Sequence, residues 1–232
     1  MKKEIFTEME YKMLEPGYVP ILSSGLGYYL DNTPINVLNE LKLQINSLKH
    51  DFNLGEKYND RLAGEIEHEY GLQVKPNLRN YIKDLAYRLE ENSGWMEQSW
   101  KNDLGNRGSH LPNTPTLNLS QLWVNFQKKH EYNPMHNHSG LFSFVLWYKV
   151  PYLLSDEQSQ YGYKVDKETV NHGQFCFILN HPISGIIQHR IPIDKNSEGM
   201  IAIFPSKLHH CVYPFYSSDE YRISISGNVL LS

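Results

Sequence analysis

The second half of the chain consists of short β-type runs, and this feature restricts the possible folds more than any other. From Leu117 onward, apolar and β-branched runs alternate with Gly, Pro, Asn and Asp, without helical periodicity. Runs of this kind, bounded by turn residues, predict strands. Short strands with no intervening helix favour an antiparallel sandwich or barrel, and a double-sheet jelly roll is the common eight-strand arrangement. The predicted strands are residues 117–126, 141–150, 161–165, 174–180, 185–193, 200–204, 209–214 and 221–230.

The first half has a helical pattern instead. Residues 33–49 repeat leucine and isoleucine at helical spacing, with Thr33 as the predicted N-cap and Pro34 at the first helical position. A second amphipathic helix is predicted over about residues 77–91, and a shorter helical piece near residues 61–70. We therefore expect an α+β, mainly β fold, in which N-terminal helices pack on one sheet of a jelly roll.

Length and composition restrict the class of protein further. A chain of 232 residues is long for one domain and short for two, so we expect a single domain, with a helical support region at 1–116 and the core at 117–232. An irregular connection is predicted at residues 102–115. Lysine and arginine number 22 against 26 aspartates and glutamates, and this net charge of −4 argues against a general polyanion binder.

The number of cysteines and the length of the apolar runs indicate the cellular compartment. Cys176 and Cys211 are too few for a disulfide scaffold or a cysteine-only metal site, and they suggest a reducing compartment. No stretch approaches the roughly 20 apolar residues of a membrane helix. A cytoplasmic location is expected from these two observations.

A pair of histidines, His136 and His138, lies in a polar turn with one residue between them. Residues two apart in extended chain point to the same side, so both imidazoles can face one metal ion. The alternative for an isolated pair is hydrogen bonding to solvent and backbone. No further ligand is obvious nearby, because Asp and Glu are absent between Asn137 and Ser155.

A second histidine pair, His209 and His210, follows an apolar strand and a proline-marked turn. Adjacent strand residues face opposite ways, so only one of the two can point inward. Alternation places His210 on the same side as Leu208 and Val212, and we assign His210 to the interior. A β-barrel can bring it close to the first pair.

The last predicted strand carries Arg222, Ser224 and Ser226 on one face. A buried arginine needs an anionic partner, and its planar fork suits a carboxylate, to which the Ser224 hydroxyl would add a donor. The alternative is a surface ion pair between Arg222 and Asp219 or Glu220.

In this order, the HxH pair, the distal histidine and the RxSxS strand resemble the iron(II)/2-oxoglutarate-dependent oxygenases. The similarity covers roughly residues 123–230 and is greatest to the prolyl-4-hydroxylase-like branch common in phage and marine bacterial genomes. It implies a double-stranded β-helix (jelly roll) and a dioxygenase that hydroxylates a C–H bond, with release of succinate and CO2. It further implies that Fe(II) is bound at His136, His138 and His210, and 2-oxoglutarate at Arg222 and Ser224.

One ligand departs from the family pattern, because His138 stands where Asp or Glu is usual. Either three imidazoles hold the iron, or one histidine is not a ligand and a carboxylate comes from elsewhere, with Glu131 the nearest upstream candidate. Three neutral ligands leave the ion one charge more positive than the usual set.

Two other interpretations stay open at this point. A cupin-type three-histidine metalloprotein shares the fold but does not require Arg222 and Ser224, and a non-catalytic jelly-roll binding module requires no metal at all. Dioxygen and 2-oxoglutarate are the expected partners of the leading interpretation, in a host cytoplasm if the chain is phage-encoded. The substrate (a protein, a small molecule or a nucleobase) and the oligomeric state are not indicated.

Overall fold

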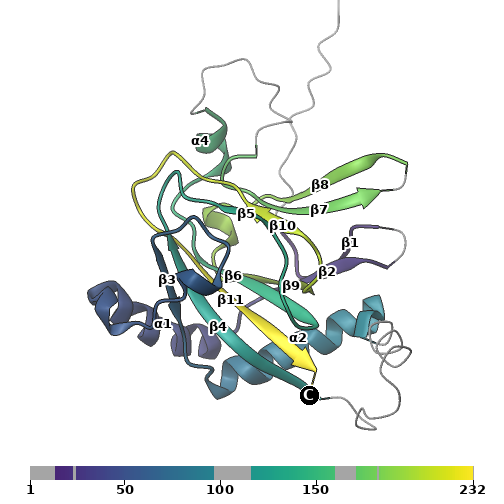
Figure 1. Cartoon of the computed structure of the whole chain (residues 1–232), viewed down its shortest axis with the longest axis horizontal. Helices are drawn as coiled ribbons and strands as arrows, with labels where there is room; N and C mark the ends of the chain where they lie inside the picture. The colour runs from purple at the N-terminus through teal and green to yellow at the C-terminus, as the bar shows by residue number, and fades with distance from the viewer. Residues whose placement is uncertain (1–13, 23–24, 97–115, 160–170, 182, 232) are drawn as a thin grey trace, which may run out of the picture.

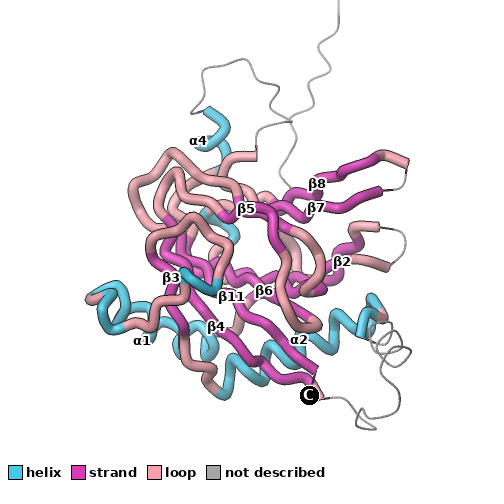
Figure 2. The backbone as a smooth tube through the Cα atoms, in the orientation of Figure 1, coloured by secondary structure: helices cyan, strands magenta, loops and turns pink. Residues whose placement is uncertain are grey.

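The computed structural model describes residues 14–22, 25–96, 116–159, 171–181 and 183–231. Antiparallel strands dominate this part of the chain, and few helices accompany them (Figures 1 and 2). The mainly β class predicted from the sequence is therefore confirmed. The predicted strand at 161–165 and the predicted connection at 102–115 lie outside the described residues.

The strands form two sheets, and within each sheet every pair of neighbouring strands is antiparallel. The larger sheet has seven strands, in the order β1 (Gly17–Pro20), β2 (Gly27–Asn32), β9 (Met200–Pro205), β6 (Phe142–Lys149), β11 (Arg222–Leu231), β4 (Leu117–Gln127) and β3 (His68–Gly71). The smaller sheet has four, in the order β5 (Asn133–His136), β10 (His210–Val212), β7 (Phe175–His181) and β8 (Gly185–Ile191).

An apolar core fills part of the space between the two sheets. Side chains of β2, β6 and β9 meet side chains of β7 and β8 in one buried cluster. Because successive strand residues alternate between faces, each strand sends every second side chain into this core. The members that define it include Leu30, Val145, Trp147, Ala202, Phe204, Phe175, Phe177 and Ile191.

The opposite face of the larger sheet packs on two helices, α1 (Ile35–His50) and α2 (Pro76–Ser93). The buried stripe of α1 and that of α2 belong to one cluster with the outer side chains of β4, β6, β9 and β11. Figure 1 shows both helices along this sheet, away from the smaller one. A short helix, α4 (Leu154–Ser159), and 3-10 turns at Phe52–Leu54, Asn59–Arg61 and Lys195–Ser197 complete the described elements. None of the described helices has the length and apolar character needed to cross a membrane.

The first helix starts differently from the prediction. The N-cap is Pro34, which provides no side-chain hydrogen bond, and the helix begins at Ile35. The Thr33 hydroxyl is buried and has no partner among the described residues. The helical piece predicted near residues 61–70 is also wrong, because this stretch holds the end of a 3-10 turn and strand β3.

Four strands were not predicted: β1, β2, β3 and β5. Each is short, and β1 and β5 contain a proline, which lacks the N–H that a ladder needs. Both of these strands lie at the edge of their sheets, where a proline is tolerated. Strands this short have too few alternating residues to show a period of two.

Candidate metal centre and the adjoining cavity

The structure brings three of the predicted residues together on the smaller sheet. His136 ends β5, His138 follows two positions later, and His210 begins β10 directly opposite His136 in the strand register. The ring centroids are 4.3 Å apart for His136 and His210, and 5.0 Å for each ring with His138. One ligand atom from each ring lies within 4.8 Å of the others. The expectation that His136 and His138 point to the same side is met.

The loop after β5 is fixed by hydrogen bonds to the turn after β9. The His138 amide donates to the carbonyl of Ser206 (2.9 Å), and the Ser206 amide donates to the carbonyl of Leu141 (3.0 Å). Gly140 has φ +98°, and a Cβ there would lie 2.9 Å from the Val229 carbonyl oxygen. Only glycine accommodates both this backbone and this close approach without strain. The proline-marked turn thus positions both His138 and the strand that carries His210.

Backbone carbonyls orient two of the rings. The Nδ1–H of His136 donates to the carbonyl of Pro134 (2.7 Å), and that of His210 donates to the carbonyl of Leu208 (2.9 Å). With the proton assigned to Nδ1 by these contacts, the Nε2 lone pair of each ring is free to bind a cation.

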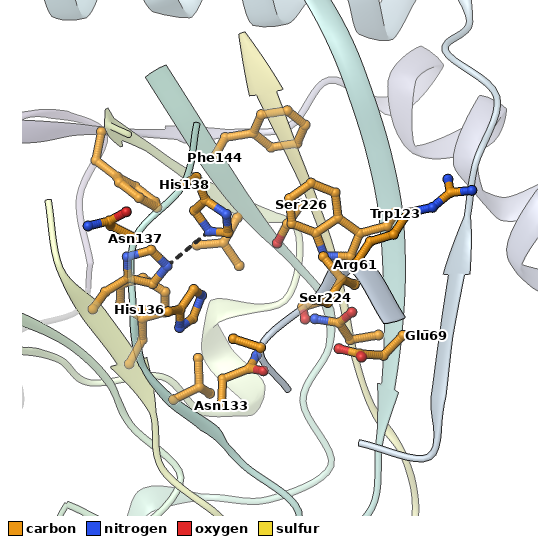
Figure 3. A pocket seen from close by; sticks show the side chains of 18 residues that line it. Arg61, Glu69, Trp123, Asn133, His136, Asn137, His138, Phe144, Ser224 and Ser226 are labelled. Carbon is orange, nitrogen blue, oxygen red and sulfur yellow. Dashed lines mark hydrogen bonds between the residues drawn. The ribbon is translucent and has the colours of Figure 1, made fainter. Parts of the chain in front are cut away.

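The spacing of the ring nitrogens matches two ligands of one ion. The Nε2 atoms of His138 and His210 lie 3.2 Å apart, as the dashed line in Figure 3 marks. Two nitrogens at about 2.0–2.1 Å from a metal, with an angle between octahedral and tetrahedral values, lie roughly 2.8–3.4 Å from each other.

Burial keeps the three imidazoles neutral. It lowers the pKa of His136, lowers that of His138 to about 3 with a smaller effect from His136, and lowers that of His210 well below its usual value. A metal binds the neutral form of histidine, so at neutral pH no proton has to leave these rings first.

The alternative carboxylate ligand is not at the cluster. Glu131 accepts hydrogen bonds from the backbone amides of Lys128 (2.7 Å) and Glu67 (3.1 Å). Within the described residues, no Asp, Glu or Cys joins the three histidines as a group of ligands. His209 is exposed and contacts Asn137, in agreement with the outward orientation predicted for it.

Arg222 lies on the predicted inner face of β11 and is 2% exposed. The surface ion pair considered for it is wrong, because Asp219 pairs with Lys129 and Glu220 with Lys149. All five of its N–H groups donate to neutral acceptors: the Gln127 side chain twice, the Tyr152 hydroxyl, and the carbonyls of Gly173 and Tyr213. The guanidinium is thus buried without a carboxylate partner among the described residues.

A cavity of about 160 Å³ lies against the histidines, between the two sheets. Ser224 and Ser226 of β11 line it together with Trp123 and Asn125 of β4, and with Glu69 of β3. Figure 3 shows His136 and His138 at one side of this cavity and Glu69 at the other. Arg222 is not among the lining residues and lies next to Gln127, two register pairs beyond Ser224 and Asn125 in the β11–β4 ladder.

Sequence reasoning missed Glu69 and Asn125. Glu69 is 1% exposed, and both of its carboxyl oxygens lack a hydrogen-bond partner among the described residues, as does the buried Asn125 amide oxygen. Burial, with a smaller contribution from the Glu131 charge, raises the pKa of Glu69 to about 8. The signal in the sequence was weak, since β3 is short and its stretch was interpreted as helical.

Comparison with known proteins identifies the class. Residues 121–228 match the model of a family described as putative 2OG-Fe(II) oxygenase. This segment contains the three histidines, Arg222 and Ser224, and it makes the β-rich part of the chain similar to the 2OG-Fe(II) oxygenases. The protein is accordingly an oxidoreductase that uses iron(II), 2-oxoglutarate and dioxygen. This match favours the oxygenase interpretation over the cupin and over the non-catalytic module.

Solved structures give a more distant likeness. A prolyl-4-hydroxylase from Pseudomonas putida is 13% identical, with a TM-score of 0.49, over 86% of this chain and 90% of that one. The viral collagen prolyl hydroxylase of Paramecium Bursaria Chlorella virus-1, solved with 2OG, is 13% identical with a TM-score of 0.41, over 87% and 94%. At these values the likeness carries no argument about substrate. No curated protein matches the sequence.

Proposed function

We propose that His136, His138 and His210 hold the iron(II), and that Arg222 and Ser224 bind 2-oxoglutarate. The observation that carries the first part is the convergence of three neutral imidazoles, one buried and two half-buried, with one ring nitrogen of each within 4.8 Å of the others beside a cavity. When bound, iron(II) with 2-oxoglutarate and dioxygen supplies the oxidising chemistry that hydroxylates a C–H bond and releases succinate and CO2.

The residues present fit a metal of this kind. Imidazole nitrogen is a suitable ligand for iron, and three ligands on one side leave coordination positions open toward the cavity. The backbone carbonyls of Pro134 and Leu208 hold two rings in the tautomer that ligation requires. His138 takes the place of the usual carboxylate, so the protein contributes no negative charge to the ion. We infer that anionic co-ligands are favoured at this site for that reason.

Arg222 is suited to the second carboxylate of 2-oxoglutarate because its charge is not neutralised. A buried charge without a counter-ion is costly, and an incoming carboxylate would replace neutral acceptors with a charge-assisted pair. The Gln127 side chain accepts two of the present bonds, and an incoming carboxylate would take its place as acceptor. Ser224, two residues along the same face, lines the cavity that the histidines border.

The two-sheet arrangement supports a jelly-roll fold. We infer a double-stranded β-helix, in which the smaller sheet carries the histidines and the larger sheet carries Arg222 and Ser224. The helices α1 and α2 pack on the outer face of the larger sheet, and we propose that residues 1–232 form a single domain.

Anaerobic titration with Fe(II) and 2-oxoglutarate tests the assignment. The wild-type chain should develop a visible charge-transfer band, and Arg222→Ala should weaken 2-oxoglutarate binding by at least thirtyfold, or about 2 kcal/mol. Arg222→Lys keeps the charge but loses the bidentate fork, so an intermediate affinity is expected.

Arg88→Ala, which removes ion pairs with Asp84 and Asp31 far from the histidines in the chain, is the matched control and should bind as wild type. Thermal unfolding of each variant separates loss of the ligand from loss of the fold. Unchanged 2-oxoglutarate affinity in folded Arg222→Ala would show that the anchor lies elsewhere.

A further inference from the structure

The larger sheet presents a polar row to the cavity, formed by side chains on three neighbouring strands. In the strand registers, Glu69 of β3 lies opposite Asn125 of β4, and Asn125 lies opposite Ser224 of β11. Residues paired in this way project from the same face of a sheet. All three line the cavity that the histidines border. The row therefore faces the metal centre from the other sheet.

Three oxygen atoms of this row have no hydrogen-bond donor within the part of the chain that the structure describes. They are Oε1 and Oε2 of Glu69 and Oδ1 of Asn125. Buried polar atoms without partners are rare, and each costs about 1–3 kcal/mol. The two side chains are 1% and 5% exposed, so this cost is not relieved by bulk water. Such an arrangement is typical of a site whose donors arrive with a ligand.

Two basic side chains of this region pair with other carboxylates. Arg61, which lines the same cavity, donates to Glu56 (2.8 Å) and lies over the Tyr58 ring. Lys128 pairs with Glu67 (2.7 Å). Neither forms an ion pair with Glu69, and within the described residues its carboxyl group has no cationic partner.

The loop after the second 3-10 turn closes this end of the cavity. Its Glu65 amide donates to the Tyr132 carbonyl (2.9 Å), which fixes the loop beside the start of β5. A Cβ on Gly64 would lie 2.4 Å from Asn133 Oδ1 and 2.6 Å from Glu69 Oε1. Glycine therefore allows the backbone to cover the carboxyl group closely, and Asn133 brings a further oxygen to the same place.

We propose that Glu69 and Asn125 form a substrate subsite that binds a positively charged nitrogen group, an ammonium or a guanidinium. The proposal rests on the oxygenase function above, since it gives the chemical class of the substrate of that site. A cationic nitrogen supplies several N–H donors at once, and a carboxylate with amide oxygens accepts them. With this group held at the larger sheet, the attached carbon chain extends toward the histidines.

Charge explains why a cation is favoured over a neutral amide. Without a ligand the carboxyl group holds a proton, because burial and the Glu131 charge raise its pKa to about 8. A bound cation offsets this desolvation and stabilises the ionised carboxylate. A neutral amide offers donors but leaves the ionised form as costly as before, so it gains less from the site.

Calorimetric titration of the full chain with butylguanidinium, butylammonium and butyramide tests the proposal. The two cations should bind wild type, and butyramide should bind at least tenfold more weakly. Glu69→Gln, which keeps the shape and removes the charge, should weaken butylguanidinium binding at least tenfold. Asn125→Ala should weaken it severalfold. Glu67→Gln, two residues away and exposed, is the matched control and should bind as wild type.

The outcomes separate this proposal from the oxygenase function. Equal binding of butyramide and butylguanidinium, absence of cation binding, or unchanged affinity in Glu69→Gln would each overturn the cation subsite. Loss of 2-oxoglutarate affinity in folded Glu69→Gln would overturn it too, because the residue would then serve the co-substrate. If wild type binds the cations through Glu69 but binds no Fe(II) and 2-oxoglutarate, the subsite stands and the oxygenase assignment of these histidines falls.

Discussion

The Nε2 atom of His138 lies 3.2 Å from that of His210, although the two residues are 72 positions apart in the chain. His210 carries its proton on Nδ1, where the Leu208 carbonyl accepts it, so its Nε2 presents a lone pair. His138 can donate to this lone pair only in the tautomer that is protonated on Nε2; in the other tautomer both nitrogens present lone pairs that one cation would bind. The contact therefore suits two ligands of one metal ion.

His209 and His210 are adjacent in the chain, and comparing them tests which histidines bind the metal. His210→Ala should lower Fe(II) affinity by more than about a hundredfold, because it removes one of three ligands and not only an outer hydrogen bond. His209→Ala should leave the affinity unchanged, since that side chain is exposed and contacts Asn137. Anaerobic equilibrium dialysis with metal analysis measures both. Similar losses in the two variants would contradict the assignment.

Tyr152 links the Arg222 side chain to the backbone at Gly173, which lies just before strand β7 of the smaller sheet. Its hydroxyl accepts from Arg222 Nη1 (2.6 Å) and donates to the Gly173 carbonyl (2.6 Å). Tyr152→Phe should lower the free energy of unfolding by about 1–3 kcal/mol, because it leaves buried polar groups with fewer partners. Tyr87→Phe, on an exposed helix position, should change it by less than about 0.5 kcal/mol. Urea unfolding compares the two, and equal effects would show that the buried hydroxyl contributes nothing.

Glu69 should give the ligand-free protein a characteristic pH dependence. The folded-state pKa is raised to about 8, so between the ordinary value of 4.5 and about 8 the folded chain retains a proton that the unfolded chain has released. The stability that this proton contributes is complete below the pKa of the unfolded state and is lost as pH rises through the pKa of the folded state. The free energy of unfolding then falls by at most about 1.4 kcal/mol per pH unit. Glu69→Gln should remove this slope, so its stability relative to wild type should rise from pH 5 to pH 8. Urea unfolding at several pH values measures it, and parallel curves for the two proteins would refute the shift.

Helix α1 offers two leucines of opposite environment. Leu41 is 0% exposed and Leu43 is 76% exposed. Leu41→Ala should cost about 2–5 kcal/mol of unfolding free energy, because it leaves a cavity between the helix and the larger sheet. Leu43→Ala should cost less than about 0.5 kcal/mol. Comparable losses would mean that this helix does not pack on the sheet as the structure has it.

The sequence was informative where the pattern was long and regular. The alternation of Ile223 and Ile225 with Ser224 and Ser226 gave the correct two faces of β11, since the isoleucines join the helix-side core. The assignment of His210 as the inward member of its pair rested on the same period of two and agrees with its position in the cluster. In a long strand that lies between an apolar core and a cavity, the alternation of apolar and polar residues predicts which side chains face each of them.

The polar row could not be predicted, because it depends on pairing between distant segments. Nothing near Glu69 in the chain indicates that it will lie opposite Asn125, and β3 has only four residues. Strand β5 was missed for a similar reason: Pro134 argues against a strand until the edge position of β5 is known. Register and edge position are properties of the assembled sheets.

The alternation in β11 has a consequence for how this chain can vary in length. A one-residue deletion within this strand would exchange the two faces on one side of the deletion, turning isoleucines toward the cavity beside the histidines and serines into the helix-packed interior. Both the lining of that cavity and the apolar packing on the opposite face would be lost together. Insertions and deletions should therefore be confined to the turns on either side of β11, whereas point substitutions can alter one face and spare the other.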